Sequence, residues 1–249
     1  MQKVLLVIPP DYDRHYPPLG TPALAAYLKK HAIPCEQLDL NLGYRDFLAG
    51  HISGPAPLTR EEQRFFLQPA LEKFFNEKLR GRYYSAFLPR EAGLVERLPY
   101  GNNTNSSFSF GEQLLSSDCL WRYLEDREEN TFYQFYEAGP IASLLEKGER
   151  SIVGISIISP AQAVAGLTLG LFIKKKFPAV HVTIGGQWAT LYRSAIMRKQ
   201  ELFRCFDSVI TFEGESALCE LARRLEKNRD ISSVPNCMVP GTTEDPALS

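Results

Sequence analysis

Short apolar segments alternate with segments of helical character along most of this chain, and few protein folds accommodate such an alternation. We predict strands at 3–8, 35–40, 152–158, 180–184 and 208–212. The first is apolar at almost every position, which is typical of a strand buried on both faces of a sheet. Helical patterns occupy 20–31, 162–177 and 215–228. The last two are amphipathic and carry basic residues in their last turns, as helix C-termini prefer.

Strands separated by helices predict an α/β fold, in which right-handed crossovers build a doubly wound parallel sheet with helices on both faces. Five such strands favour the flavodoxin-like (Rossmann-type) order 2-1-3-4-5. In that order a crevice forms between strands 1 and 3 at the carboxyl ends of the strands, where open α/β sheets bind their ligands. The segments that follow strands 1, 3, 4 and 5 are therefore the candidate site.

The segment between the second and third strands is much longer than a crossover helix requires. It contains 18 of the 28 aromatic residues of the chain, so we expect it to pack a core of its own or to cover a flat surface. Thr59 and Glu62 have the spacing of a capping box, and we expect helices at 113–127 and 130–146. The predicted parts are residues 1–41, the first half of the α/β domain; 42–150, a mainly helical insertion; 151–239, the second half; and 240–249, a linker.

Composition excludes several classes of protein. The net charge is −1 and the isoelectric point is near 6.5, so nothing attracts the chain to nucleic acid or to an anionic membrane surface. The apolar segments are too short to span a bilayer, and we expect a cytoplasmic protein. Five cysteines without CxxC spacing predict neither a zinc nor an iron–sulfur site, and Cys237 fits a strand. His31, His51 and His181 lack metal-binding spacing and are expected on surfaces.

Glycines and acids follow the predicted strands at the expected edge. Gly185 and Gly186 end the fourth strand, where the lack of a Cβ atom lets the backbone approach a ligand closely. Glu213 and Glu215 follow the fifth strand, and Ser156 lies in the third. Each feature alone also has a structural interpretation: a tight turn, acids at a helix N-terminus, or a buried hydroxyl with a partner. Their occurrence together favours a ligand site.

The same segments carry a family pattern. The matching stretches are 3–10 (KVLLVIPP), 16–28 (YPPLG and the following helix), 153–156 (VGIS), 185–190 (GGQWAT), 206–215 (FDSVITFEGE) and 234–236 (VPN). In these stretches the chain resembles the N-terminal cobalamin (B12)-binding domain of B12-dependent radical SAM enzymes. The resemblance covers about half of the chain, everything but the insertion, and its pieces occur in the expected order.

The resemblance implies that cobalamin binds with its nucleotide tail inside the sheet domain and its corrin ring across the strand ends. The implied cofactor-binding residues are Pro10, Leu19, Ser156, Ile157, Ser159, Gln162, Gly185, Gly186, Gln187, Trp188, Thr190, Glu213, Gly214 and Glu215. Asp13 and His15 resemble part of the DxHxxG motif that supplies a cobalt ligand in another B12 class, but Pro18 stands in place of the glycine. The resemblance therefore implies base-off cobalamin without histidine ligation.

The resemblance further implies a methyltransferase, in which a C-terminal radical SAM barrel holds a 4Fe-4S cluster and S-adenosylmethionine. The CxxxCxxC motif of such a barrel does not occur in this chain, so we expect these residues to act with a barrel in cis and to turn over nothing alone. The alternatives are a standalone corrinoid carrier, a B12-sensing domain or an interaction module. A phosphorylated receiver domain is disfavoured, because the segment after the third strand offers no aspartate.

Overall fold

The computed structural model describes residues 3–10, 18–41, 43–44, 47, 117–128, 130–148, 151–159 and 162–242. The chain divides into two compact units. The first unit comprises Met1–Pro10, Pro18–Leu40 and Phe132–Ser249, and the second comprises Asp11–Pro17 and Asn41–Thr131. The predictions for Thr59, Glu62, His51 and His15 lie outside the described residues.

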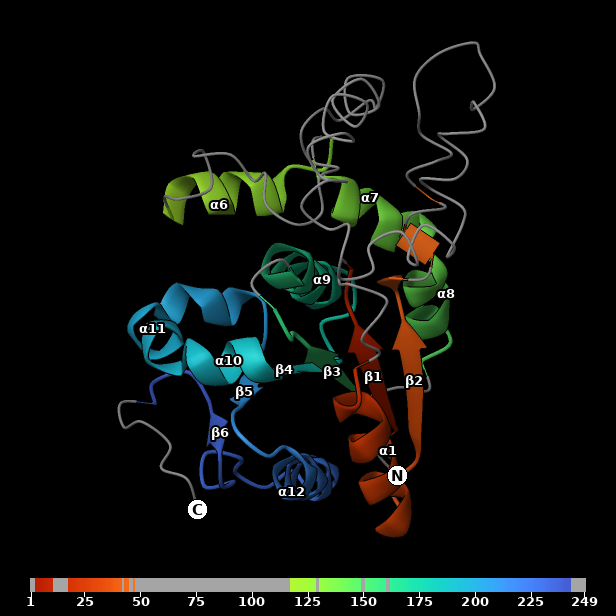
Figure 1. The fold of residues 1–249 in the computed structure, drawn as a ribbon, viewed down its shortest axis with the longest axis vertical. Helices are drawn as coiled ribbons and strands as arrows, with labels where there is room; N and C mark the ends of the chain where they lie inside the picture. Colours follow the sequence, from red (N-terminus) through yellow and green to blue (C-terminus); the bar gives the residue numbers. More distant parts are fainter. Residues whose placement is uncertain are drawn as a thin grey trace, which may run out of the picture. The chain divides into compact units, whose positions relative to one another are not determined.

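The first unit contains one mixed sheet of six strands, most of them parallel. The strands are β1 (Val4–Ile8), β2 (Cys35–Asp39), β3 (Ile152–Ser156), β4 (His181–Gly185), β5 (Ser208–Ile210) and β6 (Cys237–Met238). They lie in the order β2-β1-β3-β4-β5-β6, with β2 and β6 at the two edges (Figure 1). The first five strands pair in parallel, and β6 pairs antiparallel with β5. The prediction for Cys237 is confirmed, but the purely parallel five-stranded sheet that we predicted was incomplete.

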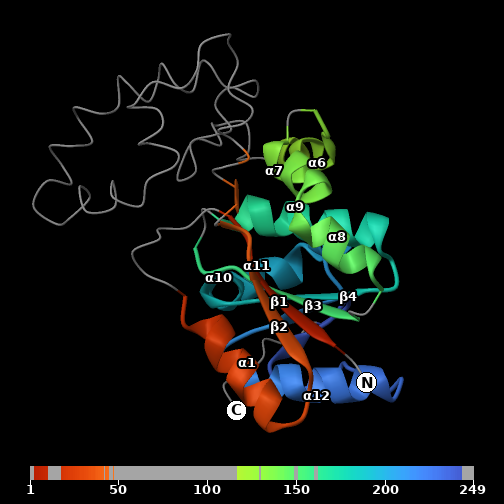
Figure 2. The ribbon, with the colours of Figure 1, turned by 90° about the vertical axis from the view of Figure 1, so that its right-hand side faces the viewer.

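Helices cover both faces of this sheet (Figure 2). Those of the first unit are α1 (Gly20–Lys30), α7 (Thr131–Ala138), α8 (Pro140–Glu146), α9 (Ala163–Lys176), α10 (Gln187–Leu191), α11 (Arg193–Arg198), the 3-10 helix η4 (Gln200–Arg204) and α12 (Glu215–Glu226). The single helix predicted over 130–146 was wrong, since it divides at Gly139. A Cβ atom there would lie 2.5 Å from the carbonyl oxygen of Phe135, and Pro140 starts the next helix without an N–H group. No helix among the described residues is long and apolar enough to cross a membrane.

The two faces of the sheet have different cores. On one face, β-strand residues such as Val4, Leu6 and Ile210 pack with α1 and α12. On the other face lies α9, which is buried on nearly all sides and not amphipathic as we predicted. The reason is an outer layer: the Tyr136 hydroxyl of α7 donates to the carbonyl oxygen of Ala165 at 3.0 Å, and other aromatic residues of α7 pack beside it. The α9 helix therefore has no solvent-facing stripe in its middle.

The second unit contains the helix α6 (Ser117–Glu125) among its described residues. The hydroxyls of Tyr44 and Thr131 lie 2.7 Å apart and are buried. The side-chain amide of Asn130 donates to the carbonyl oxygen of Tyr123 at 3.1 Å. The contact between Tyr44 and Thr131 joins residues that are 87 positions apart in the sequence, whereas the bond from Asn130 to Tyr123 is local.

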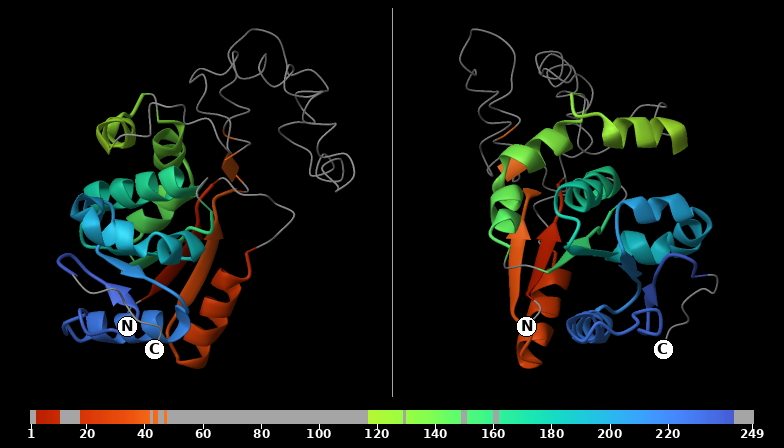
Figure 3. Two further views of the ribbon diagram at one scale, coloured as in Figure 1. Left: turned by 60° about the vertical axis from the view of Figure 1, so that its left-hand side comes forward. Right: turned by 180° about the vertical axis from the view of Figure 1, so that it is seen from behind.

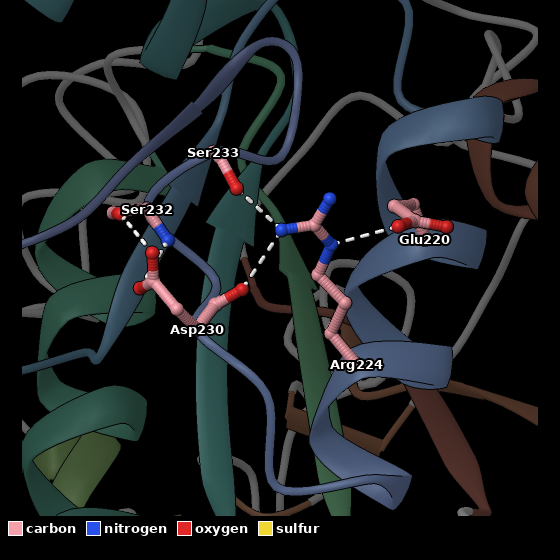
Figure 4. Close-up of polar contacts among 5 residues, drawn as sticks. All are labelled: Glu220, Arg224, Asp230, Ser232 and Ser233. Atoms are coloured by element: carbon pink, nitrogen blue, oxygen red, sulfur yellow. Dashed lines mark hydrogen bonds and ion pairs between the residues drawn. The ribbon is translucent and has the colours of Figure 1, made fainter.

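A polar network fixes the turn between α12 and β6 (Figure 4). The Arg224 guanidinium donates to the Glu220 carboxylate at 2.7 Å, to the carbonyl oxygen of Asp230 at 2.9 Å and to the hydroxyl of Ser233. The Asp230 carboxylate accepts bonds from the backbone and hydroxyl of Ser232. The bond from Arg224 lowers the pKa of Glu220, and the bonds from Ser232 lower the pKa of Asp230.

We expect the substitution Arg224→Met to lower the free energy of unfolding at neutral pH, and we expect its effect to shrink on acidification. The bond from Arg224 lowers the folded-state pKa of Glu220, so the stabilisation from this pair is present above the ordinary pKa of glutamate and is lost as the pH falls below about 4. Urea denaturation at several pH values measures this difference. Lys227→Met, at the exposed end of the same helix, is the control and should change little. An Arg224→Met effect that is constant with pH would contradict the prediction.

Candidate functional site

A cavity of about 270 Å³ lies between the sheet and the helices α1 and α12 of the first unit. The two helices lie side by side on this face of the sheet (Figure 3). Residues of β1, β3, β4 and β5 form the floor, and Leu24 and Leu218 of the two helices form the roof. The cavity reaches the carboxyl edge of the sheet, where Gly20 and Glu213 border it. This is the edge at which the sequence predicted a site.

Four small residues on two neighbouring strands form the centre of the floor. Gly154 pairs with Thr183, and Ser156 pairs with Gly185, so each pair joins β3 to β4. Side chains two residues apart on a strand face the same side, and all four of these residues line the cavity. Across the two strands, Gly154 is therefore the diagonal neighbour of Gly185, and Ser156 is the diagonal neighbour of Thr183. The cavity exists because larger side chains at these positions would occupy its volume.

Gly186 turns the chain sharply away from the floor. Its φ angle is +95°, and a Cβ atom there would lie 2.5 Å from the carbonyl oxygen of Ile157. The Ile157 backbone is held on both sides, because its N–H donates to Gly185 at 2.9 Å and its carbonyl oxygen accepts from Trp188 at 3.1 Å. Both the angle and the close contact require glycine at this position.

The loop from Phe212 to Gly214 forms the mouth of the cavity. Phe212 has a φ angle of +58°, a rare conformation for an aromatic residue. Its backbone N–H donates to the Thr190 hydroxyl at 2.8 Å, and the Arg193 guanidinium lies 5.1 Å from the centre of its ring. The neighbouring Thr211 N–H donates to the carbonyl oxygen of Asn236 at 2.9 Å. Strained backbone that is held in this way is characteristic of functional sites.

The Thr183 hydroxyl is the notable polar group of the interior. The residue is 3% exposed, and its hydroxyl oxygen has no hydrogen-bond partner among the residues that the structure describes. Leu6 and Leu218, which also line the cavity, are apolar, and the neighbour of Thr183 on β5 is Ser208, whose hydroxyl lies 2.9 Å from the His181 ring nitrogen. A buried hydroxyl without a partner costs roughly 1–3 kcal/mol, so a ligand that satisfies it gains from doing so.

The cavity brings together six of the fourteen residues that the resemblance implied. They are Ser156, Gly185, Gly186, Glu213, Gly214 and Glu215. The other eight do not line it: Pro10, Leu19, Ile157, Ser159, Gln162, Gln187, Trp188 and Thr190. Leu19 is 78% exposed and precedes Gly20 at the mouth. The Trp188 ring packs at 5.6 Å from that of Tyr192, and Gln187 is exposed.

Gln162 holds two strand ends together. Its side-chain oxygen accepts from the N–H groups of Ile158 and Ser159 at 3.0 and 3.4 Å, and its side-chain nitrogen donates to the carbonyl oxygen of Pro9 at 2.8 Å. The residue is fully buried. It therefore joins the ends of β1 and β3 at the crevice, as Thr190 joins α10 to the mouth loop.

The sequence reasoning missed Gly154 and Thr183. The signal was available, because each lies two residues before a predicted site residue on the same strand, and such residues share a face of the sheet. It also missed Leu24, Phe212 and Leu218. Their place in the cavity depends on how α1, α12 and the mouth loop pack, which no local pattern specifies.

A separate polar cluster lies at the opposite, amino edge of the sheet. The Lys174 ammonium lies 2.5 Å from the Asp207 carboxylate, which also accepts from the Val182 N–H at 2.8 Å. His181 is half-buried and its ring nitrogen lies 2.9 Å from the Ser208 hydroxyl, so the surface position that we predicted was wrong. Burial lowers the pKa of His181. Among the described residues, no group of histidines, cysteines and acids is arranged to hold a metal ion.

Comparison with known proteins gives a weak structural similarity. No protein-family model matches the sequence, and a search of curated proteins finds no match. The chain is similar to the radical S-adenosylmethionine methyltransferase TsrM from Kitasatospora setae, in a structure with tryptophan substrate and a SAM analog bound (14% identity, TM-score 0.49). A TsrM structure with cobalamin and a 4Fe-4S cluster bound gives 14% identity and a TM-score of 0.47. The similarity covers 96% of this chain and 28% and 27% of those chains, so the chain spans less than a third of their length.

We expect Thr183→Val to raise the free energy of unfolding of the ligand-free protein by about 1 kcal/mol, because valine has the same shape and removes the buried hydroxyl that lacks a partner. Thr211→Val is the matched control. The Thr211 hydroxyl donates to the carbonyl oxygen of Asn236 at 3.2 Å, so this variant should lose about 1 kcal/mol. Chemical denaturation measures both values. Equal destabilisation by the two substitutions would show that the Thr183 hydroxyl has a partner in solution.

Proposed function

We propose that this chain is the cobalamin-binding domain of a B12-dependent radical SAM enzyme, a methyltransferase. The observation that carries the proposal is the cavity at the carboxyl edge of the sheet, with its floor of small residues. Ligands of open α/β sheets bind at this edge, next to the strand where the order reverses. The strand order around β1 and β3 also supports a flavodoxin-like assignment of the domain.

The size of the cavity fits one part of the cofactor. At about 270 Å³ it is near the lower end of the range of roughly 300–1,000 Å³ that is usual for small-molecule sites. A flat base and its sugar fit such a volume, whereas the much larger corrin ring does not. The nucleotide tail would therefore enter the cavity and the corrin would lie outside, across the strand ends.

The residues present fit a nucleotide tail. Ser156 and Thr183 offer hydroxyls to a heterocyclic base, and the glycines on the same strands leave room for it. Glu213 and Glu215 at the mouth offer acceptors to ribose hydroxyls or corrin amides. We propose that the residues around the mouth contact the rest of the cofactor: Pro10, Leu19, Ile157, Ser159, Gln162, Gln187, Trp188 and Thr190.

A nucleotide base that occupies this cavity cannot also ligate cobalt, so the proposal includes base-off cobalamin. Following the motif resemblance, we also propose that no histidine replaces the base. When bound, cobalamin supplies methyl-group transfer chemistry at cobalt. The protein's own residues bind and orient the cofactor, and the S-adenosylmethionine and 4Fe-4S chemistry would belong to a C-terminal barrel in cis. We further propose that residues 42–150 are an insertion in the sequence of this domain, of which the last part, α7 and α8, packs in the first unit, and that 240–249 lead to the barrel.

Absorption spectroscopy tests the proposal and separates the alternatives. The purified chain is mixed with hydroxocobalamin and desalted, and the visible spectrum of the retained cofactor is recorded. A base-off spectrum supports the proposal. A histidine-ligated spectrum would favour a corrinoid carrier, and no retained cobalamin would favour an interaction module.

We expect Ser156→Leu to weaken cobalamin binding by roughly 10- to 100-fold, because the larger side chain fills the floor of the cavity at an overpacking cost of about 1–3 kcal/mol. Ser143→Leu is the matched control. It makes the same chemical change at an exposed position of α8, and it should bind as the wild type does. Titrations followed by absorbance measure both dissociation constants. Unchanged binding by a folded Ser156→Leu variant would place the cofactor elsewhere.

A further inference from the structure

The two hydroxyls of the cavity floor lie at different depths. Ser156 and Gly185 form the pair nearer the carboxyl edge, and Gly154 and Thr183 form the pair two residues deeper. Two residues along a strand correspond to about 6–7 Å. The floor therefore has a shallow hydroxyl and a deep hydroxyl, whose depths differ by about the length of a fused two-ring heterocycle.

The deep hydroxyl can gain a hydrogen bond from a ligand. Thr183 is almost fully buried, and its hydroxyl has no hydrogen-bond partner among the described residues. The threonine lines the cavity beside Gly154, where a Cβ atom would lie 3.8 Å from the Thr183 methyl group and 3.1 Å from Leu6. Rotation about χ1 exchanges the hydroxyl and methyl groups between staggered positions, so the hydroxyl can turn toward a ligand in this space.

The bases found in corrinoid nucleotides differ at the end that would reach this depth. Dimethylbenzimidazole carries nitrogen only in its five-membered ring, and two methyl groups at the other end. A purine carries nitrogens in both rings. A methyl group next to Thr183 leaves the hydroxyl unsatisfied after binding, whereas a purine nitrogen accepts its hydrogen bond.

We infer that the cavity selects a heteroaromatic base with hydrogen-bonding atoms at both ends, and hence that it prefers a corrinoid with a purine nucleotide over one with dimethylbenzimidazole. The inference rests on the proposed function, since it concerns the base of the same bound nucleotide. Ser156 meets the near end of either base, and Thr183 distinguishes them by their far ends. Because the purine base forms one hydrogen bond where dimethylbenzimidazole leaves the hydroxyl unsatisfied, we expect the affinity for the purine corrinoid to be roughly tenfold higher.

Equilibrium titrations of the full chain test this selection with three probes: cobalamin, the corrinoid with an adenine base, and cobinamide, which lacks the nucleotide. Wild type should bind the adenine form roughly tenfold more tightly than cobalamin, and cobinamide more weakly than either. Thr183→Val should abolish the preference by weakening only the adenine form. Ser156→Ala is the matched control, and it should weaken both complete corrinoids by a similar factor and leave their ratio unchanged.

Four outcomes would overturn the inference. If wild type binds cobalamin at least as tightly as the adenine form, or if Thr183→Val weakens both equally, the base is not selected at this residue and the proposed function still stands. If cobinamide binds as well as the complete corrinoids, or if none of the three is retained, the nucleotide does not occupy the cavity and the proposed function fails as well. Valine has the shape of threonine, so Thr183→Val should fold, and its far-ultraviolet circular dichroism confirms this.

Discussion

The pairing of β3 with β4 determines whether the sheet has a cavity at all. Gly154 faces Thr183 and Ser156 faces Gly185, so two glycines and a serine leave three of four adjacent positions on one face of the sheet with little side-chain volume. A parallel sheet that is covered by helices normally fills such a face with branched aliphatic residues, as this sheet does elsewhere at Val4, Leu6 and Ile152. A shift of the pairing by one residue would turn these positions to the opposite face. The cavity is thus a consequence of register as much as of composition.

The two faces of the sheet differ in how completely they are packed. The face toward α9 is filled with aliphatic side chains and covered further by the aromatic residues of α7. Gly170 of α9 shows how closely this layer packs, since a Cβ atom there would lie 2.2 Å from the carbonyl oxygen of Cys205. The face toward α1 and α12 is equally buried at its amino end, and only its carboxyl end opens into the cavity. A well-packed layer on one side offsets the contacts that the cavity lacks.

The sequence predicts the part of this arrangement that depends on local patterns. Apolar runs locate the strands β1, β3 and β4 within two residues, and Gly185 with Gly186 marks the edge where the cavity opens. The two-residue strand β6 is too short for periodicity to reveal, although Cys237 was assigned to a strand. The split at Gly139 was missed because aromatic residues continue the helical pattern on its N-terminal side. Thr183 was overlooked since a threonine within an apolar strand resembles an ordinary β-former. Its place on the cavity floor becomes visible only when the pairing with Gly154 and the roof from α12 are known.

The loop from Phe212 to Gly214 at the mouth of the cavity is held by residues that do not line the cavity. Phe212 has an unfavourable backbone angle, so the loop keeps its shape only if its neighbours hold it. One support is Thr190, and the other is Asn236, whose carbonyl oxygen accepts the backbone and hydroxyl bonds of Thr211. Asn236 directly precedes β6, and the turn that leads to β6 is fixed to α12 by Arg224. The antiparallel strand at the edge of the sheet thus has a physical role beyond pairing, because it anchors the loop that borders the cavity.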